Sequence, residues 1–182
     1  KPGFVFNSGK HAGIGILIEK GQYIILDGLT INGGKMNAIR IRDSRNIIVT
    51  NCDISGYGQG GVFRPELDGK YYNAKNKPIW HDAGITVRGC EDVIIERNYI
   101  HDPRTPGNSW FYSHPAGPTA VYTGDAASVV LRYNDFIGSD KHRWNDAIEG
   151  WGNGALNGSV KADAEIYGNY LAFGNDDGME MD

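Results

Sequence analysis

The sequence has few cysteines, no cluster of basic residues and no long apolar run. Two cysteines in 182 residues, Cys52 and Cys90, do not make a disulfide framework. A formal net charge of -4 without a Lys/Arg cluster argues against a nucleic-acid or anionic-membrane surface, because such partners need a concentrated positive field. Apolar runs such as IGILI at 14–18 fall far short of the roughly 20 residues that a membrane-spanning helix needs. We therefore expect no nucleic-acid partner and no membrane span.

The chain starts at Lys1 and shows no charged-then-apolar signal segment. Such a start is typical of a mature secreted form or of a piece excised from a longer protein. We expect a secreted protein, extracellular or periplasmic.

Glycine and short runs of β-branched residues are abundant. The chain contains 26 glycines, and its hydrophobic residues, 40% of the total, occur in short runs instead of long amphipathic stretches. This composition favours an all-β chain with many turns. The length fits one domain over residues 1–182, which we expect to be a monomer.

A repeat runs through most of the chain. Each copy has an apolar cluster and, five residues after the end of that cluster, a second apolar anchor. Successive anchors are 23, 46, 36 and 35 residues apart, so the shortest spacing matches about one coil of a solenoid and the others match a coil with an inserted loop. The copies are YIILDGLTI (23–31), NIIVTNCDI (46–54), DVIIERNYI (92–100), SVVLRYNDF (128–136) and DAEIYGNYL (163–171).

A second strand pattern accompanies the repeat. Short alternating strands that recur once per coil stack as parallel sheets about 4.8 Å apart, and the density of Gly, Asn and Asp between them excludes helical crossovers. The handedness of β connections makes the coil right-handed. We therefore predict an all-β, right-handed, single-stranded parallel β-helix. The additional strands are GILI (15–18), AIRI (38–41), GITV (84–87), AVYT (120–123), AIEG (147–150) and GMEM (178–181).

One column of the repeat is rich in asparagine. Two residues before the second anchor lie Leu29, Cys52, Asn98, Asn134 and Asn169. The three asparagines can form a ladder whose amides bond neighbouring coils, or they can be present only because Asn tolerates turn geometry. Cys52 in this column is expected to be a small buried residue without a catalytic role.

Two long loop insertions interrupt the coils, at about 56–82 and 102–119. Loops of this length in a compact fold tend to carry function, and exposed aromatic rings suit sugars; the alternative is that the rings pack the loops onto the solenoid. No two histidines have a metal-binding spacing, so no metal ligand is assigned. The predicted substrate-binding residues are Trp80, His81, Trp110, Tyr112, His114, Arg143, Trp144 and Trp151.

Acidic residues concentrate in the last two coils. Aligning NDAIEGW (145–151) with DDGMEMD (176–182) puts Asp146 level with Asp177 and Glu149 level with Glu180. These columns hold no acid in earlier coils, where Arg40 and Thr86 stand in the glutamate column. Carboxylates about 5 Å apart repel one another, which raises at least one pKa and separates a proton donor from an acceptor. Glycosidic cleavage needs such a pair, although bound Ca²⁺ or simple turn capping would also explain the acids. The predicted catalytic residues are Asp146, Asp176, Asp177, Glu149 and Glu180.

At these residues the chain resembles the right-handed β-helix carbohydrate-active enzymes, in particular the polygalacturonase-like glycoside hydrolases. That group carries an Asn-Thr-Asp-Gly strand start followed about one coil later by an Asp-Asp pair. Asn145-Asp146 resembles the first element and Asp176-Asp177 the second. The resemblance implies an inverting hydrolase. The chain departs from the pattern in having no Thr after Asn145, a longer separation, and no Gly-His-Gly or Arg-x-Lys element.

Three functions fit these observations. The preferred one is a polysaccharide-cleaving glycoside hydrolase that requires no cofactor. The second is a Ca²⁺-dependent polysaccharide lyase of the same fold, with Lys141, Arg143 or Arg104 as the base. The third is a non-catalytic carbohydrate-binding β-solenoid. Each of them has a polysaccharide or oligosaccharide as its partner.

The segment GMEM at 178–181 has the pattern of a strand whose next segments are missing. A solenoid normally ends in a polar or helical cap, and neither end of the sequence shows one. We therefore expect the chain to be a fragment of a longer solenoid.

Overall fold

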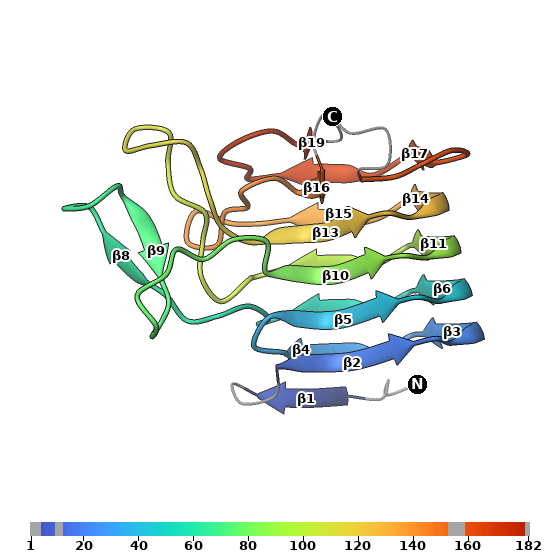
Figure 1. Ribbon diagram of the computed structural model, residues 1–182. Coiled ribbons are helices and arrows are strands. Elements are labelled where there is room, and N and C mark those ends of the chain that lie inside the picture. The colour runs from blue at the N-terminus through green and yellow to red at the C-terminus, as the bar shows by residue number, and fades with distance from the viewer. Residues whose placement is uncertain (1–4, 10–12, 153–158, 181–182) are drawn as a thin grey trace.

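A computed structural model describes residues 5–9, 13–152 and 159–180. Its regular elements in these ranges are all β-strands, and all but two of them stack in three parallel sheets that run along a common axis (Figure 1). The parallel β-helix predicted from the repeat is confirmed. No helix in the described part of the chain is long and apolar enough to cross a membrane.

Each coil contributes one strand to each sheet. Sheet A contains β1 (Val5–Gly9), β4 (Thr30–Gly33), β7 (Asp53–Ser55), β12 (Tyr99–His101), β15 (Asp135–Ile137) and β18 (Tyr170–Ala172). Sheet B contains β2 (Ile14–Glu19), β5 (Asn37–Arg42), β10 (Ala83–Arg88), β13 (Thr119–Gly124), β16 (Ile148–Gly150) and β19 (Met179–Glu180). Sheet C contains β3 (Gln22–Asp27), β6 (Arg45–Thr50), β11 (Glu91–Glu96), β14 (Ala127–Arg132) and β17 (Glu165–Tyr167). Residue 181, the end of the predicted GMEM strand, lies outside the described residues.

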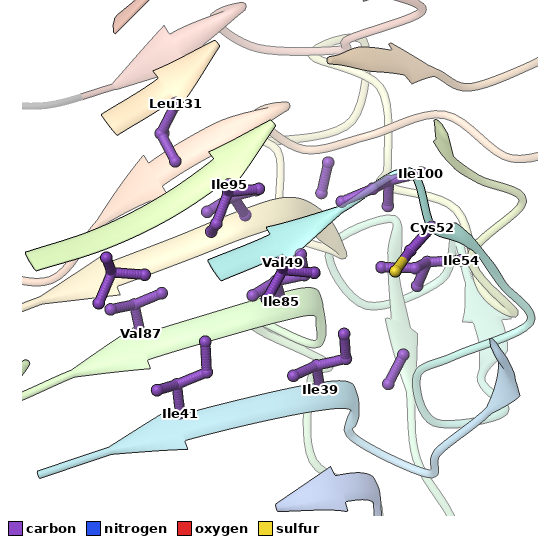
Figure 2. Packing of buried hydrophobic residues seen from close by; sticks show 14 of the residues in the cluster. Ile39, Ile41, Val49, Cys52, Ile54, Ile85, Val87, Ile95, Ile100 and Leu131 are labelled. Carbon is purple, nitrogen blue, oxygen red and sulfur yellow. The ribbon is translucent and has the colours of Figure 1, made fainter. Parts of the chain in front are cut away.

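The core fills the inside of the coil with stacked aliphatic side chains (Figure 2). In sheet B, Ile39 pairs with Ile85 and Ile41 with Val87, and all four side chains are fully buried. Successive strand residues point to opposite faces, so the residues between these inward positions lie on the outer face of the sheet. The inward stack holds the coils in register, and the outer face of sheet B remains available for polar chemistry.

The predicted asparagine ladder is confirmed at the corner between sheets C and A. The amide nitrogen of Asn98 donates to Oδ1 of Asn134 at 3.0 Å, and that of Asn134 donates to Oδ1 of Asn169 at 2.8 Å. The backbone N–H of Cys52 donates to Oδ1 of Asn98 at 3.0 Å. Cys52 itself is buried, as expected. The ladder therefore satisfies buried polar groups of the corner while it links successive coils.

The long connections leave the coil between sheets A and B, on the left of Figure 1. The first insertion contains an antiparallel hairpin of β8 (Val62–Arg64) and β9 (Lys70–Tyr72). Two buried aromatic side chains anchor this corner: the rings of Tyr57 and Trp144 stack with centroids 6.5 Å apart, and the Tyr57 hydroxyl donates to the Thr119 carbonyl at 2.8 Å. The loops thus gather beside the first residues of the sheet B strands.

Candidate active site

The glutamates of the last two coils lie in one column on the outer face of sheet B. Strand pairing places Glu149 level with Tyr122 on one side and with Glu180 on the other, as the sequence alignment predicts. Glu149 follows the inward-facing Ile148, so alternation turns its side chain outward. Its carboxylate is nevertheless 4% exposed, because the end of the first insertion covers it.

His81 is the covering residue. Its Nδ1 lies 2.7 Å from Oε1 of Glu149, and its ring centroid lies 4.9 Å from that of Tyr122. His81 has a φ of 52°, in the left-handed region that a non-glycine residue seldom adopts. Asp82 is buried and accepts the backbone N–H of Gln59 at 2.6 Å, and burial raises the pKa of Asp82 to about 6. The loop therefore presents His81 in a fixed position.

Asp146 lies at the corner just before β16. Its neighbour Trp144 is fully buried, and the Trp144 N–H donates to the Phe173 carbonyl at 3.0 Å. The Asn145 N–H donates to the Pro118 carbonyl at 2.9 Å, and the Asn145 amide donates to Oδ2 of Asp146 at 2.8 Å. These contacts hold the Asp146 carboxyl in place with 1% exposure. The substrate-binding prediction for Trp144 is wrong, because the indole is a core side chain that anchors the corner.

The predicted catalytic acids converge around Asp146. One set joins Asp146 with Glu149 and Glu180, and a second joins it with Asp176 and Asp177; within each set the nearest carboxylate oxygens all lie within 4.8 Å of one another. Asp177 is exposed, so the second set opens to solvent. The five acids predicted from the sequence therefore form one cluster centred on a buried carboxyl group.

Burial and the negative charges of neighbouring residues favour the protonated form of the Asp146 carboxyl group. Desolvation is the main cause that raises its pKa, to about 8, and the charges of Glu149, Asp176 and Glu180 add to the effect. A hydrogen bond from the Asp177 backbone acts in the opposite direction. Among the described residues, the buried Oδ1 of Asp146 has no hydrogen-bond partner. Asp146 is thus a protonated acid at neutral pH, with ionisable carboxylates beside it.

The second insertion reaches the same cluster from the other side. The indole N–H of Trp110 donates to Oδ1 of Asp176 at 3.1 Å, and Nε2 of His114 lies 3.7 Å from Oδ2 of Asp176. The rings of Trp110 and His114 meet edge to face with centroids 4.7 Å apart. Two of the predicted substrate-binding residues are therefore partners of a predicted catalytic residue.

A pocket of about 450 Å³ adjoins the cluster through Asn175. Its aromatic wall includes Tyr112 and Phe63, whose ring centroids are 5.2 Å apart. Arg143 also lines the pocket, and its guanidinium donates to Oδ1 of Asp140 at 2.7 Å. Aromatic and polar groups that converge in this way are typical of a sugar subsite.

The other predicted site residues either lie away from the acids or stabilise the loops. Trp80 is 41% exposed, and its ring centroid lies 5.8 Å from that of His81. Trp151 is exposed at the far end of β16, where Arg88 lies over its ring. Arg104, one of the bases considered for a lyase, donates to the carbonyls of Gly56 and Gly58 and so holds the first insertion. Lys141 is exposed on the same connection as Arg143.

Coils that stack in three parallel sheets around a common axis define the class of this protein as a parallel β-helix. A family described as a right handed beta helix region matches residues 5–182, and the chain belongs to this family. The right-handed coil predicted from the sequence is confirmed by this match. The fold is shared by enzymes and non-enzymes, so the reaction has to be argued from the site.

One curated relative was found, the multicopper oxidase LPR2 of Arabidopsis thaliana, which is 31% identical over 77 residues. The match covers 41% of this chain and only 12% of the length of that protein. Such a short match does not transfer an activity. No solved structure matched the chain.

Proposed function

We propose that this protein is a secreted glycoside hydrolase that cleaves a polysaccharide or oligosaccharide without a cofactor. The observation that carries the proposal is the buried Asp146 carboxyl, whose pKa is raised to about 8, within 4.8 Å of the carboxylates of Asp176 and Asp177. Glycosidic cleavage requires a carboxylic acid that protonates the leaving oxygen and a carboxylate that acts on the opposite side of the bond. Asp146 supplies the acid and the exposed Asp177 supplies the carboxylate, at a separation near the roughly 5 Å of retaining enzymes.

The residues divide the work by their exposure. Asp146 donates the proton to the leaving oxygen, because it is the acid that stays protonated at neutral pH. Asp177 is exposed and serves as the carboxylate that activates water or attacks the sugar. Glu149 and Glu180 keep the proton on Asp146 by their negative charge. Trp110 and His114 orient Asp176.

The aromatic pocket supplies a binding subsite beside this chemistry. Tyr112 and Phe63 offer ring faces to the apolar side of a sugar, and Arg143 offers donors to its hydroxyl groups. The substrate then lies across the corner where the two insertions meet, with its scissile bond at the side of the cluster that Asp177 opens to solvent.

The test is product analysis with two variants and a matched control. Asp146→Asn and Asp177→Asn each remove one acid with little change in volume, and Asp163→Asn makes the same change at an exposed position in the turn before β17. Reducing ends released from neutral and uronic polysaccharides should fall by about 10²-fold or more in the first two variants and stay unchanged in the control. Binding without any turnover, or a folded and fully active Asp177→Asn, would sink the assignment. The anomer formed first then tells whether Asp177 activates water, as the resemblance implies, or attacks the sugar.

A Ca²⁺-dependent polysaccharide lyase is the second candidate, and one observation favours it. Carboxylate oxygens of Asp146, Glu149 and Glu180 converge within 4.8 Å, and within the described ranges Oε2 of the buried Glu149 has no hydrogen-bond partner. Several hard oxygen ligands are what Ca²⁺ prefers. A lyase would release unsaturated sugars that absorb in the ultraviolet and would lose activity to a chelator, whereas the proposed hydrolase releases only reducing ends and keeps its activity.

A further inference from the structure

A second, oppositely charged pocket lies on the outer face of sheet B in the earlier coils. It has a volume of about 180 Å³ and is lined by arginines of β5 and β10 together with polar residues of neighbouring strands. Register explains the grouping: Arg40 pairs with Thr86, and Arg42 pairs with Arg88, so that alternation turns all four side chains outward. The lining residues used below are Arg40, Arg42, Arg88, Thr86 and His81.

Two of the three arginines have neutral partners. Nε of Arg40 donates to Oδ1 of the buried Asn37 at 2.9 Å, and the Asn37 amide donates to the Thr86 hydroxyl at 2.8 Å. Arg88 lies over the Trp151 ring, 5.4 Å from its centroid. Arg42, in contrast, is paired with Glu19 and Asp43. In the described part of the chain, neither Arg40 nor Arg88 has a carboxylate partner.

The guanidinium groups are close enough to influence one another. The pKa of Arg40 is lowered mainly by burial and then by the positive charges of Arg42 and Arg88. Neutral partners hold Arg40 in one orientation but do not relieve this repulsion. An anion in the pocket would relieve it, and a preorganised guanidinium suits the oxygen atoms of a carboxylate or a sulfate.

We propose that this arginine pocket binds an oxyanion substituent of the substrate, a sulfate ester or a carboxylate on one of its sugars, so that the polysaccharide is anionic. The proposal rests on and deepens the proposed function by naming the substrate class. Arg40 and Arg88 bind the oxyanion, and the exposed indole of Trp151 beside Arg88 packs against the sugar that carries it.

The pocket and the acids lie on one track. Arg40, Thr86, Tyr122 and Glu149 occupy successive positions of a single column, which spans three coil spacings or roughly 14 Å. His81 joins the two sites, because it lines the pocket and contacts Glu149. The carboxylate cluster repels an anionic group and the arginines attract it. This charge separation fixes which end of the glycan lies over Asp146.

Binding measurements on the Asp177→Asn chain test the proposal without consuming the ligand. Three oligosaccharides of equal length are compared by isothermal titration calorimetry: one of uronic acids, one bearing sulfate esters and one neutral. Arg40→Gln and Arg88→Gln are then added singly. Arg45→Gln is the matched control, since Arg45 is an exposed arginine of sheet C whose side chain bonds only Gln22 among the described residues.

We expect at least one charged ligand to bind more tightly than the neutral one. Each pocket variant should weaken that ligand by about tenfold or more, leave the neutral ligand unchanged and differ from Arg45→Gln. The charged ligand whose affinity falls in the pocket variants identifies the substituent that the pocket binds. Equal binding of all three ligands, or pocket variants that bind like the control, would overturn the proposal.

Salt dependence provides a second measurement that needs no pocket variant. The affinity for the charged ligand should fall between about 0.05 and 0.5 M salt, while the affinity for the neutral ligand should not. The same salt response for both ligands would also reject anion binding by the pocket.

The two proposals can fail separately. Tight arginine-dependent binding without cleavage by the native chain would reject the proposed hydrolase activity and support anion binding by the pocket. Cleavage of neutral glycans that is unaffected by the arginine variants would support the hydrolase activity and reject anion binding by the pocket.

Discussion

His81 and Glu149 are partners across two coils: Nδ1 of His81 lies 2.7 Å from Oε1 of Glu149. His81 immediately precedes the β10 coil, Glu149 belongs to β16, and Tyr122 of the intervening coil packs against the His81 ring. The contact therefore links the first insertion to the acid cluster. It makes His81 a positioning residue for the glutamate that helps to keep Asp146 protonated.

Replacement of His81 should impair catalysis through this contact. We expect His81→Ala to lower kcat/KM by about tenfold, because Glu149 loses a charge-assisted hydrogen bond. His81→Gln, which keeps a donor, should recover part of the loss, and the alkaline limb of the pH profile should move in the alanine variant only. His101→Ala is the control, because His101 pairs with Asp53 and Asp102 on sheet A. Wild-type kinetics in His81→Ala would exclude the role.

Asp146 should make the protein less stable as the pH rises. Its pKa is 3.8 in an unfolded chain and about 8 in the folded protein, so between these values the folded state binds a proton that the unfolded state does not. This contribution to stability is complete below pH 3.8 and is lost as the pH rises through about 8. Asp146→Asn should abolish that slope and melt at a higher temperature than wild type at alkaline pH. Parallel stability profiles for the two proteins would contradict the raised pKa.

The same proton sets the alkaline limit of the proposed reaction. Cleavage should decline as the pH passes about 8, because Asp146 then no longer has a proton to donate. Rates measured across this range with wild type and with the Asp163→Asn control should show the same decline. An activity that keeps rising well above this pH would assign the acid to another residue.

Asn134→Ala tests the ladder. Asn134 is fully buried, its amide donates to Asn169 and to the Ile95 carbonyl, and its Oδ1 accepts from Asn98. We expect the free energy of unfolding in urea to fall by about 2–4 kcal/mol, because several buried hydrogen bonds are lost together. Asn32→Ala removes one exposed bond to Ser55 and should change stability by about 0.5 kcal/mol or less. Similar losses in both variants would show that the ladder adds little.

Trp110→Phe tests the second insertion. The variant keeps an aromatic ring but removes the N–H that donates to Asp176 at 3.1 Å. We expect about a tenfold loss of kcat/KM without a change in melting temperature, since Trp110 is exposed. Phe111→Leu, at a neighbouring position that is 86% exposed, serves as the control. Unchanged kinetics in Trp110→Phe would place the indole outside the site.

Much of the fold follows from local patterns in the sequence. Strand alternation and the spacing of the anchors predict the inward stack at Ile39 and Ile85, because each depends only on residues within one coil. The asparagine ladder follows from the same register. The columns of acids were also predictable, since Glu149 and Glu180 occupy matching strand positions.

The other features of the site depend on the course of the long connections, which no local sequence pattern determines. Trp144 lies outside a strand, so alternation does not reveal that its ring turns into the core. The contact between His81 and Glu149 depends on the course of the first insertion, which ends two coils before the strand that carries Glu149. In the alignment the arginine pocket appears only as Arg40 in a column without acids in the earlier coils, because the pairing of β5 with β10 is what places Arg88 beside Arg42.

Changes in the coil and changes in the loops at the corner between sheets A and B have different consequences for a protein of this type. Side chains in the coil are tied to the register of their neighbours, whereas the connections at this corner leave the stack and return to it at the first residues of sheet B (Figure 1). Loops of different length or composition can therefore be exchanged there without shifting a strand. The scaffold thereby becomes modular: grafting another segment in place of the hairpin at 62–72, which leaves Tyr57 and His81 unchanged, should change which glycan is selected while the acids of the last two coils stay where they are.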